Sequence, residues 1–147
     1  MFKLEGKNIL VVGGGKVALR KIKAIEPHNP LITVISLEFL AELEHLIKTN
    51  KVKAVKKAFE KKDITNKWDF VFACTNDKKT NNLIADLCNR QKIPVNVVDN
   101  PKRCDFYTAA VLEYDEFFIA ISAKGKNPTL AKKIKEKLKG LMDGIFL

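Results

Sequence analysis

The chain has little cysteine and no spacing that would turn its cysteines into a scaffold. Its 147 residues include Cys74, Cys88 and Cys104, and no two of them form a C-x-x-C pair. An odd number at such spacings disfavours a disulfide framework or a zinc knuckle, so we expect ordinary buried thiols. The two histidines, His28 and His45, are far apart in the sequence, and we predict no metal site.

Long apolar runs are also absent. No stretch approaches the ~20 apolar residues of a membrane-spanning helix, and the first residues lack the apolar core of a secretion signal. We therefore expect a cytoplasmic protein with no membrane partner. The apolar content of 46% is ordinary for a globular protein, and the length suits about one domain with a real core.

Arginine is scarce in a chain that is otherwise strongly basic. Lysine and arginine number 27 against 17 acidic residues, a formal net charge of +10, and only Arg20, Arg90 and Arg103 are arginines. A basic balance suits a polyanionic partner, but few arginines and few aromatic residues interleaved with the lysines disfavour nucleic acid. We predict no nucleic-acid partner. A polyanionic small molecule, or a simple bias toward solvated lysines, accounts for the charge.

The most informative segment is a glycine turn near the start of the chain. The apolar run Asn8–Val12 ends in Gly13, Gly14 and Gly15, and a helical pattern that contains Ala18 follows. In G-x-G-x-x-A, the first glycine permits a tight turn, the second lets a pyrophosphate approach the backbone, and the alanine lets helix and strand pack closely. Because N–H groups and the helix dipole favour phosphate there, the segment predicts a dinucleotide site.

Alternating apolar runs and helical patterns predict the fold class. We expect strands over 8–12, 31–35, 52–55, 69–74 and 94–98, and helices over 16–25, 38–49 and 78–91. Ser36 would cap the second of these helices, and the segment 58–67 is loop-like with one helical turn. Strands that alternate with helices form a Rossmann-like, doubly wound parallel sheet, so the class is α/β.

The pattern changes after Asp99. Apolar runs over 108–112 and 117–122 have no helix between them and predict an antiparallel pair. Asn127 and Pro128 suit the start of a last helix, which we expect to end near 139, before Gly140. We therefore expect a dinucleotide-binding domain over 1–103 and a small α+β segment, a hairpin plus a helix, over 104–147.

Polar residues follow three of the predicted strands, at the edge where a parallel sheet binds ligands. Glu38 follows the second strand, where an acidic residue accepts hydrogen bonds from the adenosine ribose; helix capping is the alternative. Thr75, Asn76 and Asp77 follow the fourth strand and either line the ribose side of the cleft or cap the next helix, two compatible roles. No arginine lies near the second strand end to bind a 2′-phosphate, which favours NAD over NADP.

Asp99 directly follows the fifth strand. A carboxylate at this rim would meet a substrate beside the nicotinamide and could perform general acid–base work. The alternative is a turn aspartate that caps the segment beginning at Asn100 and Pro101.

Five segments together resemble the precorrin-2 dehydrogenase family, which includes the amino-terminal module of siroheme synthase. They are GGGKVALRK at Gly13–Lys21, CTND at Cys74–Asp77, NVVDNP at Asn96–Pro101, CDFY at Cys104–Tyr107, and IAISAKGKNPTLAKKIKEKL at Ile119–Leu138. The resemblance implies NAD-dependent oxidation of precorrin-2 to sirohydrochlorin in siroheme or cobalamin biosynthesis. In some members it also implies ferrochelatase activity, with ferrous iron or cobalt as the metal substrate. It further implies a homodimer formed through the segment 104–147.

The resemblance also assigns residues to roles. It makes Asp99 the catalytic residue and places Lys16, Val17, Leu37 and Glu38 at NAD. With the residues named above, the expected cofactor-binding set is Gly13, Gly14, Gly15, Lys16, Val17, Leu37, Glu38, Thr75 and Asn76. Precorrin-2 is a polycarboxylate, so Lys124, Lys126 and Asn127, near the start of the last helix, are the expected substrate-binding residues. The alternative is a truncated relative that binds NAD or a tetrapyrrole without chemistry.

Overall fold

The structure, a computed structural model, describes residues 3–123 and 126–146. It divides into two compact units, residues 1–106 and 107–147. The boundary lies slightly beyond the predicted one because Asp105 and Phe106 contact strands of the first unit. Asp105 exchanges backbone and side-chain hydrogen bonds with Val95, and Phe106 packs edge-to-face against Phe70 and Phe72.

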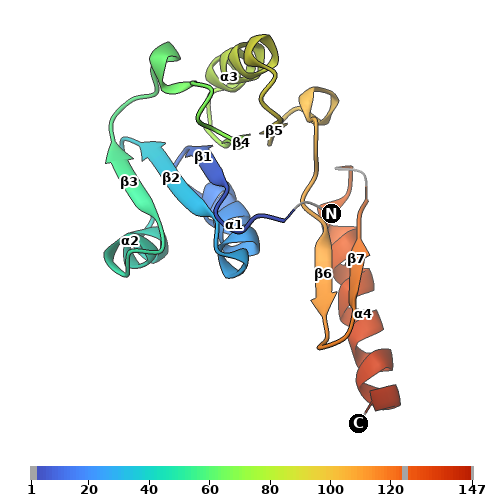
Figure 1. Ribbon diagram of the computed structural model, residues 1–147. Coiled ribbons are helices and arrows are strands. Elements are labelled where there is room, and N and C mark those ends of the chain that lie inside the picture. Colours follow the sequence, from blue (N-terminus) through green and yellow to red (C-terminus); the bar gives the residue numbers. More distant parts are fainter. Residues whose placement is uncertain (1–2, 124–125, 147) are drawn as a thin grey trace. The chain divides into compact units, whose positions relative to one another are not determined.

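Five parallel strands form the sheet of the first unit (Figure 1). They are β1 (Asn8–Val12), β2 (Leu31–Ser36), β3 (Lys53–Lys56), β4 (Phe70–Ala73) and β5 (Val95–Val97). Their order is β3-β2-β1-β4-β5, and every neighbouring pair is parallel. The chain builds outward from β1 in both directions, so a crevice forms at the carboxyl ends of β1 and β4. The predicted doubly wound sheet is confirmed.

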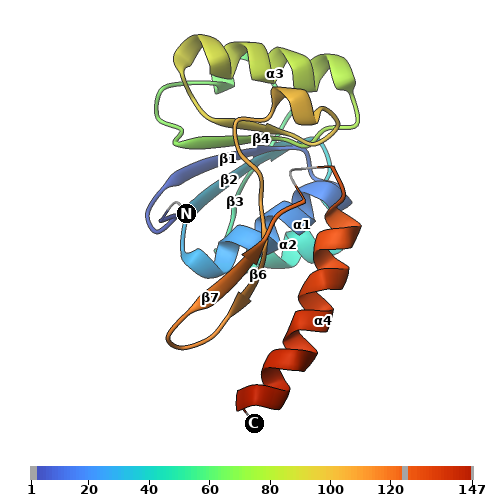
Figure 2. The same ribbon diagram turned by 90° about the vertical axis from the view of Figure 1, so that its right-hand side faces the viewer.

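Helices cover both faces of this sheet (Figures 1 and 2). Helices α1 (Lys16–Ile25) and α2 (Ala41–Lys48) lie on one face, and α3 (Lys78–Gln91) lies on the other. Successive strand residues alternate between the two cores: Val11 packs with α1, whereas Leu10 packs with α3. All of β4 is buried, as expected for a central strand covered on both sides.

Helix α2 begins later than the sequence predicts. Ser36 ends β2 and caps no helix; α2 starts at Ala41, after Leu40, with no side-chain cap. The cause is tertiary: the Leu40 N–H donates to the Gly14 carbonyl at 3.0 Å, so the chain first runs extended beneath the glycine turn.

The second unit is a hairpin and a helix. Strands β6 (Ala110–Glu113) and β7 (Phe118–Ile121) pair antiparallel, as predicted, and α4 (Pro128–Phe146) follows. The Asn127 side chain accepts a hydrogen bond from the Leu130 N–H at 2.9 Å, which caps the helix as expected. The predicted end near 139 is wrong, because α4 continues through Gly140 and Gly144. A helical glycine costs only about 1 kcal/mol relative to alanine, which the flanking helix formers offset.

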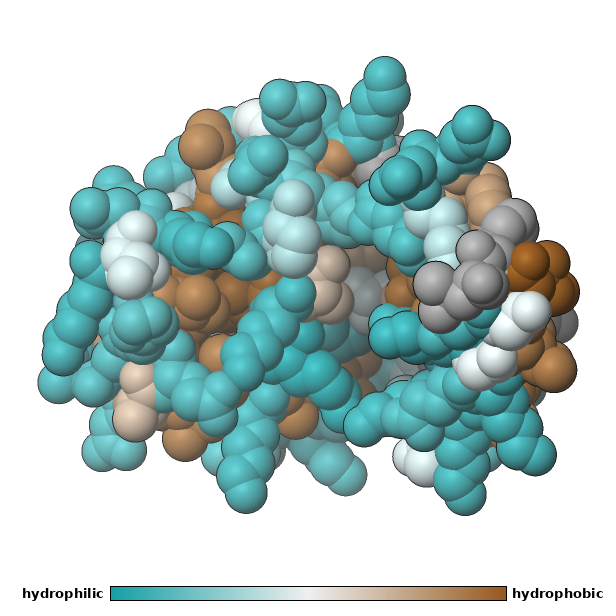
Figure 3. Space-filling model, turned by 90° about the horizontal axis from the view of Figure 1, so that it is seen from below, coloured by the Kyte–Doolittle hydropathy of each residue, from teal (hydrophilic) through white to brown (hydrophobic). Residues whose placement is uncertain are grey.

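Polar side chains dominate the face of the molecule in Figure 3, as the lysine-rich composition leads one to expect. Across the described residues, no helix combines the length and the apolarity needed to cross a membrane.

Candidate dinucleotide site

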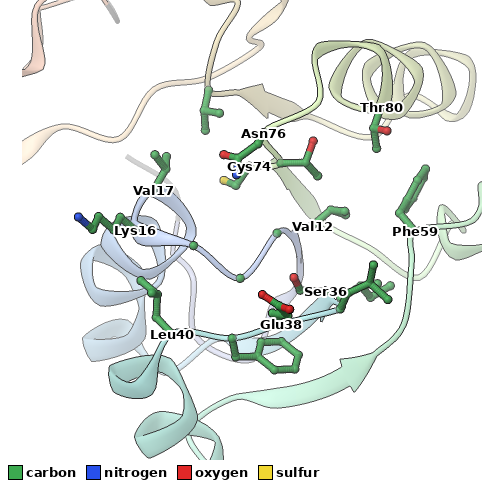
Figure 4. A pocket seen from close by; sticks show the side chains of 18 of the residues that line it. Val12, Lys16, Val17, Ser36, Glu38, Leu40, Phe59, Cys74, Asn76 and Thr80 are labelled. Atoms are coloured by element: carbon green, nitrogen blue, oxygen red, sulfur yellow. The ribbon is translucent and has the colours of Figure 1, made fainter.

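A cavity of about 1120 Å³ opens at the carboxyl ends of the strands (Figure 4). Pockets for small ligands commonly measure ~300–1,000 Å³, so this one has room for an extended cofactor. The structure brings all nine predicted cofactor-binding residues into its lining, together with Asp99. Further lining residues with charged, polar, aromatic or thiol side chains include Arg20, Lys57, Phe59, Cys74, Lys78 and Thr80.

The glycine turn is shaped by close backbone contacts. Gly13 has φ +121°, and a Cβ there would lie 2.4 Å from the Cys74 carbonyl oxygen. A Cβ on Gly14 would lie 2.0 Å from the Glu38 carbonyl oxygen. Only glycine therefore lets β1, β4 and the segment after β2 meet here.

Gly15 differs from its two neighbours, because a Cβ at this position would meet nothing within 4 Å. Its missing side chain leaves open space at the start of α1, and no side chain caps that helix. The first-turn N–H groups of α1 therefore remain available to an anion. Lys16, Val17 and Arg20 of the same helix line the cavity. A pyrophosphate fits the shape and the charge of this turn.

The turn after β4 is held by a buried amide. Asn81 is fully buried; its Oδ1 accepts hydrogen bonds from the Thr75 N–H at 3.1 Å and hydroxyl at 2.6 Å, and its Nδ2 donates to the Thr75 carbonyl at 3.0 Å. Asp77 supplies the helix cap by accepting from the N–H groups of Lys79 and Thr80. The Thr80 hydroxyl also donates to Asp77 at 2.6 Å, and this bond, followed by the backbone ones, lowers the pKa of the Asp77 carboxyl. The capping alternative thus belongs to Asp77, and Thr75 and Asn76 line the cavity.

The side chain of Glu38 lies beside the glycine turn in Figure 4, with Phe59 and Thr80 facing each other across the other end of the view. Glu38 and Leu37 are exposed to the cavity, and neither caps α2, since that helix starts three residues after Glu38. The capping alternative for Glu38 is therefore wrong. A carboxylate at the end of β2 can accept hydrogen bonds from ribose hydroxyls.

Asp99 lies in the turn that follows β5 and is exposed. Its carboxylate makes no hydrogen bond or ion pair with any residue that the structure describes, and the segment Pro101–Arg103 has no side-chain cap. The turn itself is fixed: Arg103 pairs with Asp86 and hydrogen-bonds Asn82 on α3. Asp99 is therefore a free acceptor held on an anchored loop.

The cysteines are free thiols, as expected. Cys74 and Cys88 are buried, and burial raises the pKa of each to about 12. Burial also raises the pKa of Cys104. Because a thiol with so high a pKa stays protonated at neutral pH, Cys74 contributes bulk rather than a nucleophile to the cavity wall.

Sequence reasoning missed several lining residues. Arg20 lies one helical turn inside α1 and Thr80 lies in the first turn of α3, while Lys57 and Phe59 follow β3. The latter pair reaches the cavity because β3 lies parallel beside β2 and ends at the same edge of the sheet, a neighbour relation that no local sequence pattern reveals. No group of three or more histidine, cysteine or acidic side chains gathers as a metal site in the described ranges.

The predicted substrate-binding residues that the structure describes are not among the residues that line the cavity. Lys126 and Asn127 precede α4 in the second unit, where Asn127 caps that helix. Lys124 lies outside the described residues.

Comparison with known proteins indicates which class of ligand this cavity binds. Residues 1–110 match the family model described as "Putative NAD(P)-binding". Siroheme synthases from Psychrobacter arcticus and Pseudoalteromonas translucida are each 36% identical to the chain, over 96% and 95% of its length. The chain spans only 26% and 29% of those two relatives.

A solved structure of "SirC, precorrin-2 dehydrogenase" superposes with a TM-score of 0.76 at 29% identity, covering 95% of this chain and 68% of that one. With the open glycine turn and uncapped α1, these matches confirm the predicted nicotinamide cofactor. The predicted likeness to precorrin-2 dehydrogenase and siroheme synthase is confirmed as well, and the chain belongs to the NAD(P)-binding family whose model it matches.

Proposed function

We propose that the chain catalyses the NAD-dependent oxidation of precorrin-2 to sirohydrochlorin. One observation carries the proposal: Asp99 and the glycine turn line the same cavity. The likeness to a precorrin-2 dehydrogenase over nearly the whole chain supports the choice of substrate. Because the chain spans under a third of the siroheme synthases above, the proposal concerns this one reaction of such proteins.

Different residues of the cavity would contact different parts of the cofactor. Gly15 and the first turn of α1 would hold the pyrophosphate, with Lys16 and Arg20 supplying positive charge. Glu38 would accept hydrogen bonds from the adenosine ribose, and Thr75 and Asn76 would line the second ribose. When bound, NAD⁺ supplies the acceptor for the hydride that leaves the tetrapyrrole.

Asp99 is proposed as the proton acceptor. The oxidation removes a hydride and a proton from the substrate, so a base must receive the proton as the hydride leaves. A carboxylate with no partner in the described part of the chain has its lone pairs free for this task. The contacts of Arg103 with α3 would keep the loop, and with it the carboxylate, in place.

The substrate is a polyanion, and the chain carries a net charge of +10 that attracts it. We infer that Lys126 and Asn127, with Lys124, bind its carboxylates. Insertion of ferrous iron or cobalt into sirohydrochlorin remains a separate prediction, as does a cytoplasmic location.

We also propose a homodimer formed through the second unit. Four exposed apolar side chains recur along α4 at spacings that place them on one helical face: Leu130, Ile134, Leu141 and Ile145. Phe117 and Phe118 of the hairpin are exposed too. Exposed apolar side chains gathered in this way are typical of protein–protein contacts.

The decisive experiment follows NADH absorbance when the purified chain is mixed with precorrin-2 and NAD⁺, with Asp99→Ala measured in parallel. We expect NADH and sirohydrochlorin in equal amounts from the wild type. A folded wild-type protein that binds NAD⁺ and tetrapyrrole but forms no NADH would favour the non-catalytic binding module. Metal insertion is then tested separately, by adding ferrous iron or cobalt to sirohydrochlorin in the absence of NAD⁺.

A further inference from the structure

A lysine that sequence reasoning missed lies at the adenosine end of the cavity. Lys57 directly follows β3 and lines the cavity with Glu38 and Phe59. Its backbone N–H donates to the Ser36 carbonyl at 3.1 Å, which fixes it beside the end of β2. Phe59 offers an aromatic surface for a base there. A cation at this strand end is the kind of group that binds the 2′-phosphate of NADP.

The ammonium of Lys57 is already occupied. It lies 2.7 Å from Asp63 Oδ1 and 3.0 Å from Glu60 Oε1, and Lys62 pairs with the other oxygen of Glu60 at 2.9 Å. The charges of these two lysines and two carboxylates cancel, so this cluster of four residues presents no net charge to the cavity. The hydrogen bonds from Lys57 to both carboxylates raise the pKa of its ammonium, so the group stays protonated and paired.

The partner carboxylates are held in place by the fold. Glu60 and Asp63 cap each other's backbone across the short helix Lys61–Asp63, and the Asp63 side chain is only 11% exposed. The Trp68 indole donates to the Asp63 carbonyl at 2.8 Å, which ties the segment to the core. Lys57 would therefore have to leave two fixed partners to meet a phosphate.

The opposite end of the cavity has the reverse arrangement. Lys16 and Arg20 of α1 line it, and neither forms an ion pair with another residue in the described ranges. Positive charge is thus available where a pyrophosphate binds and withheld where a 2′-phosphate would bind. With Glu38 exposed at the same strand end, the adenosine side is the less cationic of the two.

This inference rests on the proposed NAD-dependent function and assigns its cofactor preference to particular residues. We propose that Glu60 and Asp63 make the chain select NAD over NADP by occupying Lys57, so that the 2′-phosphate of NADP would face Glu38 without the charge of this lysine.

The test measures binding of NADH and NADPH to the full chain by fluorescence titration, so it needs no tetrapyrrole. In the double variant Glu60→Gln/Asp63→Asn, the NADPH dissociation constant should fall by about five- to tenfold, the effect of one partly exposed ion pair. The NADH constant should change less than about twofold. Adding Lys57→Met to the double variant should remove the gain. The gain should also shrink as salt rises.

A control variant separates this local effect from net charge. Glu42→Gln/Glu136→Gln makes the same change in charge at residues that pair with Lys23 and Lys132 and do not line the cavity. It should leave the NADPH:NADH ratio unchanged. If loss of the mutual caps unfolds the double variant, the single variant Glu60→Gln keeps Asp63 and should show a smaller gain in the same direction.

The possible failures are distinguishable. An unchanged ratio in a folded double or single variant, or an equal gain in the control, would overturn the inference while the wild type still binds NADH. A wild type that binds neither dinucleotide would overturn the proposed function and this inference with it.

Discussion

The two units of the chain manage their apolar surface differently. Among the described residues of the first unit, the large apolar side chains left exposed are Leu31 and Leu37, and Leu37 lines the cofactor cavity. The described residues of the second unit, which is far shorter, include seven: Tyr107, Phe117, Phe118, Leu130, Ile134, Leu141 and Ile145. The first unit buries its own core on both sides of the sheet. The contrast agrees with the cofactor site proposed for the first unit and with the dimer contact proposed for the second.

The largest expected effect tests whether the chemistry resides in the first unit. Asp99→Ala should lower NADH formation from precorrin-2 by about 10²–10⁴-fold, the usual contribution of a positioned general base. NAD⁺ binding should stay within about twofold, because no interaction with the described residues is lost. Turnover near the wild-type rate would remove the proton-acceptor role and leave the cavity as a binding site alone.

The second prediction compares one glycine in each unit. Gly13→Ala should destabilise the chain by roughly 3 kcal/mol, because its φ is +121° and the new Cβ would meet the Cys74 carbonyl at 2.4 Å. Gly140→Ala is the matched control, since a Cβ there meets nothing within 4 Å and lies in α4. It should stabilise the chain by about 0.5–1 kcal/mol. Denaturant unfolding measures both; equal effects would contradict the tight turn.

The third prediction concerns the interface assigned to the second unit. Leu141 and Ile145 are 65% and 70% exposed. Either one changed to Glu should raise the dimer dissociation constant at least about tenfold, given ~1.5–3 kcal/mol for burying such a side chain. Sedimentation measures the constant, and NADH binding by the first unit should not change. Lys139→Gln, exposed on the same helix, makes the same change in charge and should leave the dimer intact.

The smallest expected effect is a pH dependence at the Asp77 cap. The folded-state pKa of Asp77 lies below its ordinary value of 3.8, so the cap stabilises the chain above that pH and is lost as pH falls through the folded-state pKa. Asp77→Asn should therefore lower the melting temperature at pH 6, and its difference from the wild type should narrow toward pH 3. A difference that stays constant with pH would rule out the charge as its cause.

Local sequence signals explain which ends of strands and helices could be predicted. The bounds of β1, α1 and α3 match the predicted ones because each end is set nearby, by the glycine turn and by the Asp77 cap. The start of α2 was missed because a contact with Gly14, distant in sequence, delays the helix. The end of α4 was missed because two glycines break the pattern without breaking the helix.

The same distinction between local and distant signals applies to the residues that line the cavity. Residues at the ends of β1, β2, β4 and β5 could be predicted, since each follows its own strand signal. Lys57 and Phe59 could not be placed without knowing that β3 lies beside β2 in the sheet order. The pairing of Lys57 with Asp63 depends in turn on how the connection to β4 folds back on itself.

The buried amide of Asn81 has a consequence for how a ligand arrives. The Asn81 side chain forms hydrogen bonds with the N–H, the hydroxyl and the carbonyl of Thr75, and these bonds connect the turn after β4 to α3. That wall of the cleft is rigid before anything enters, so docking there freezes few additional torsions.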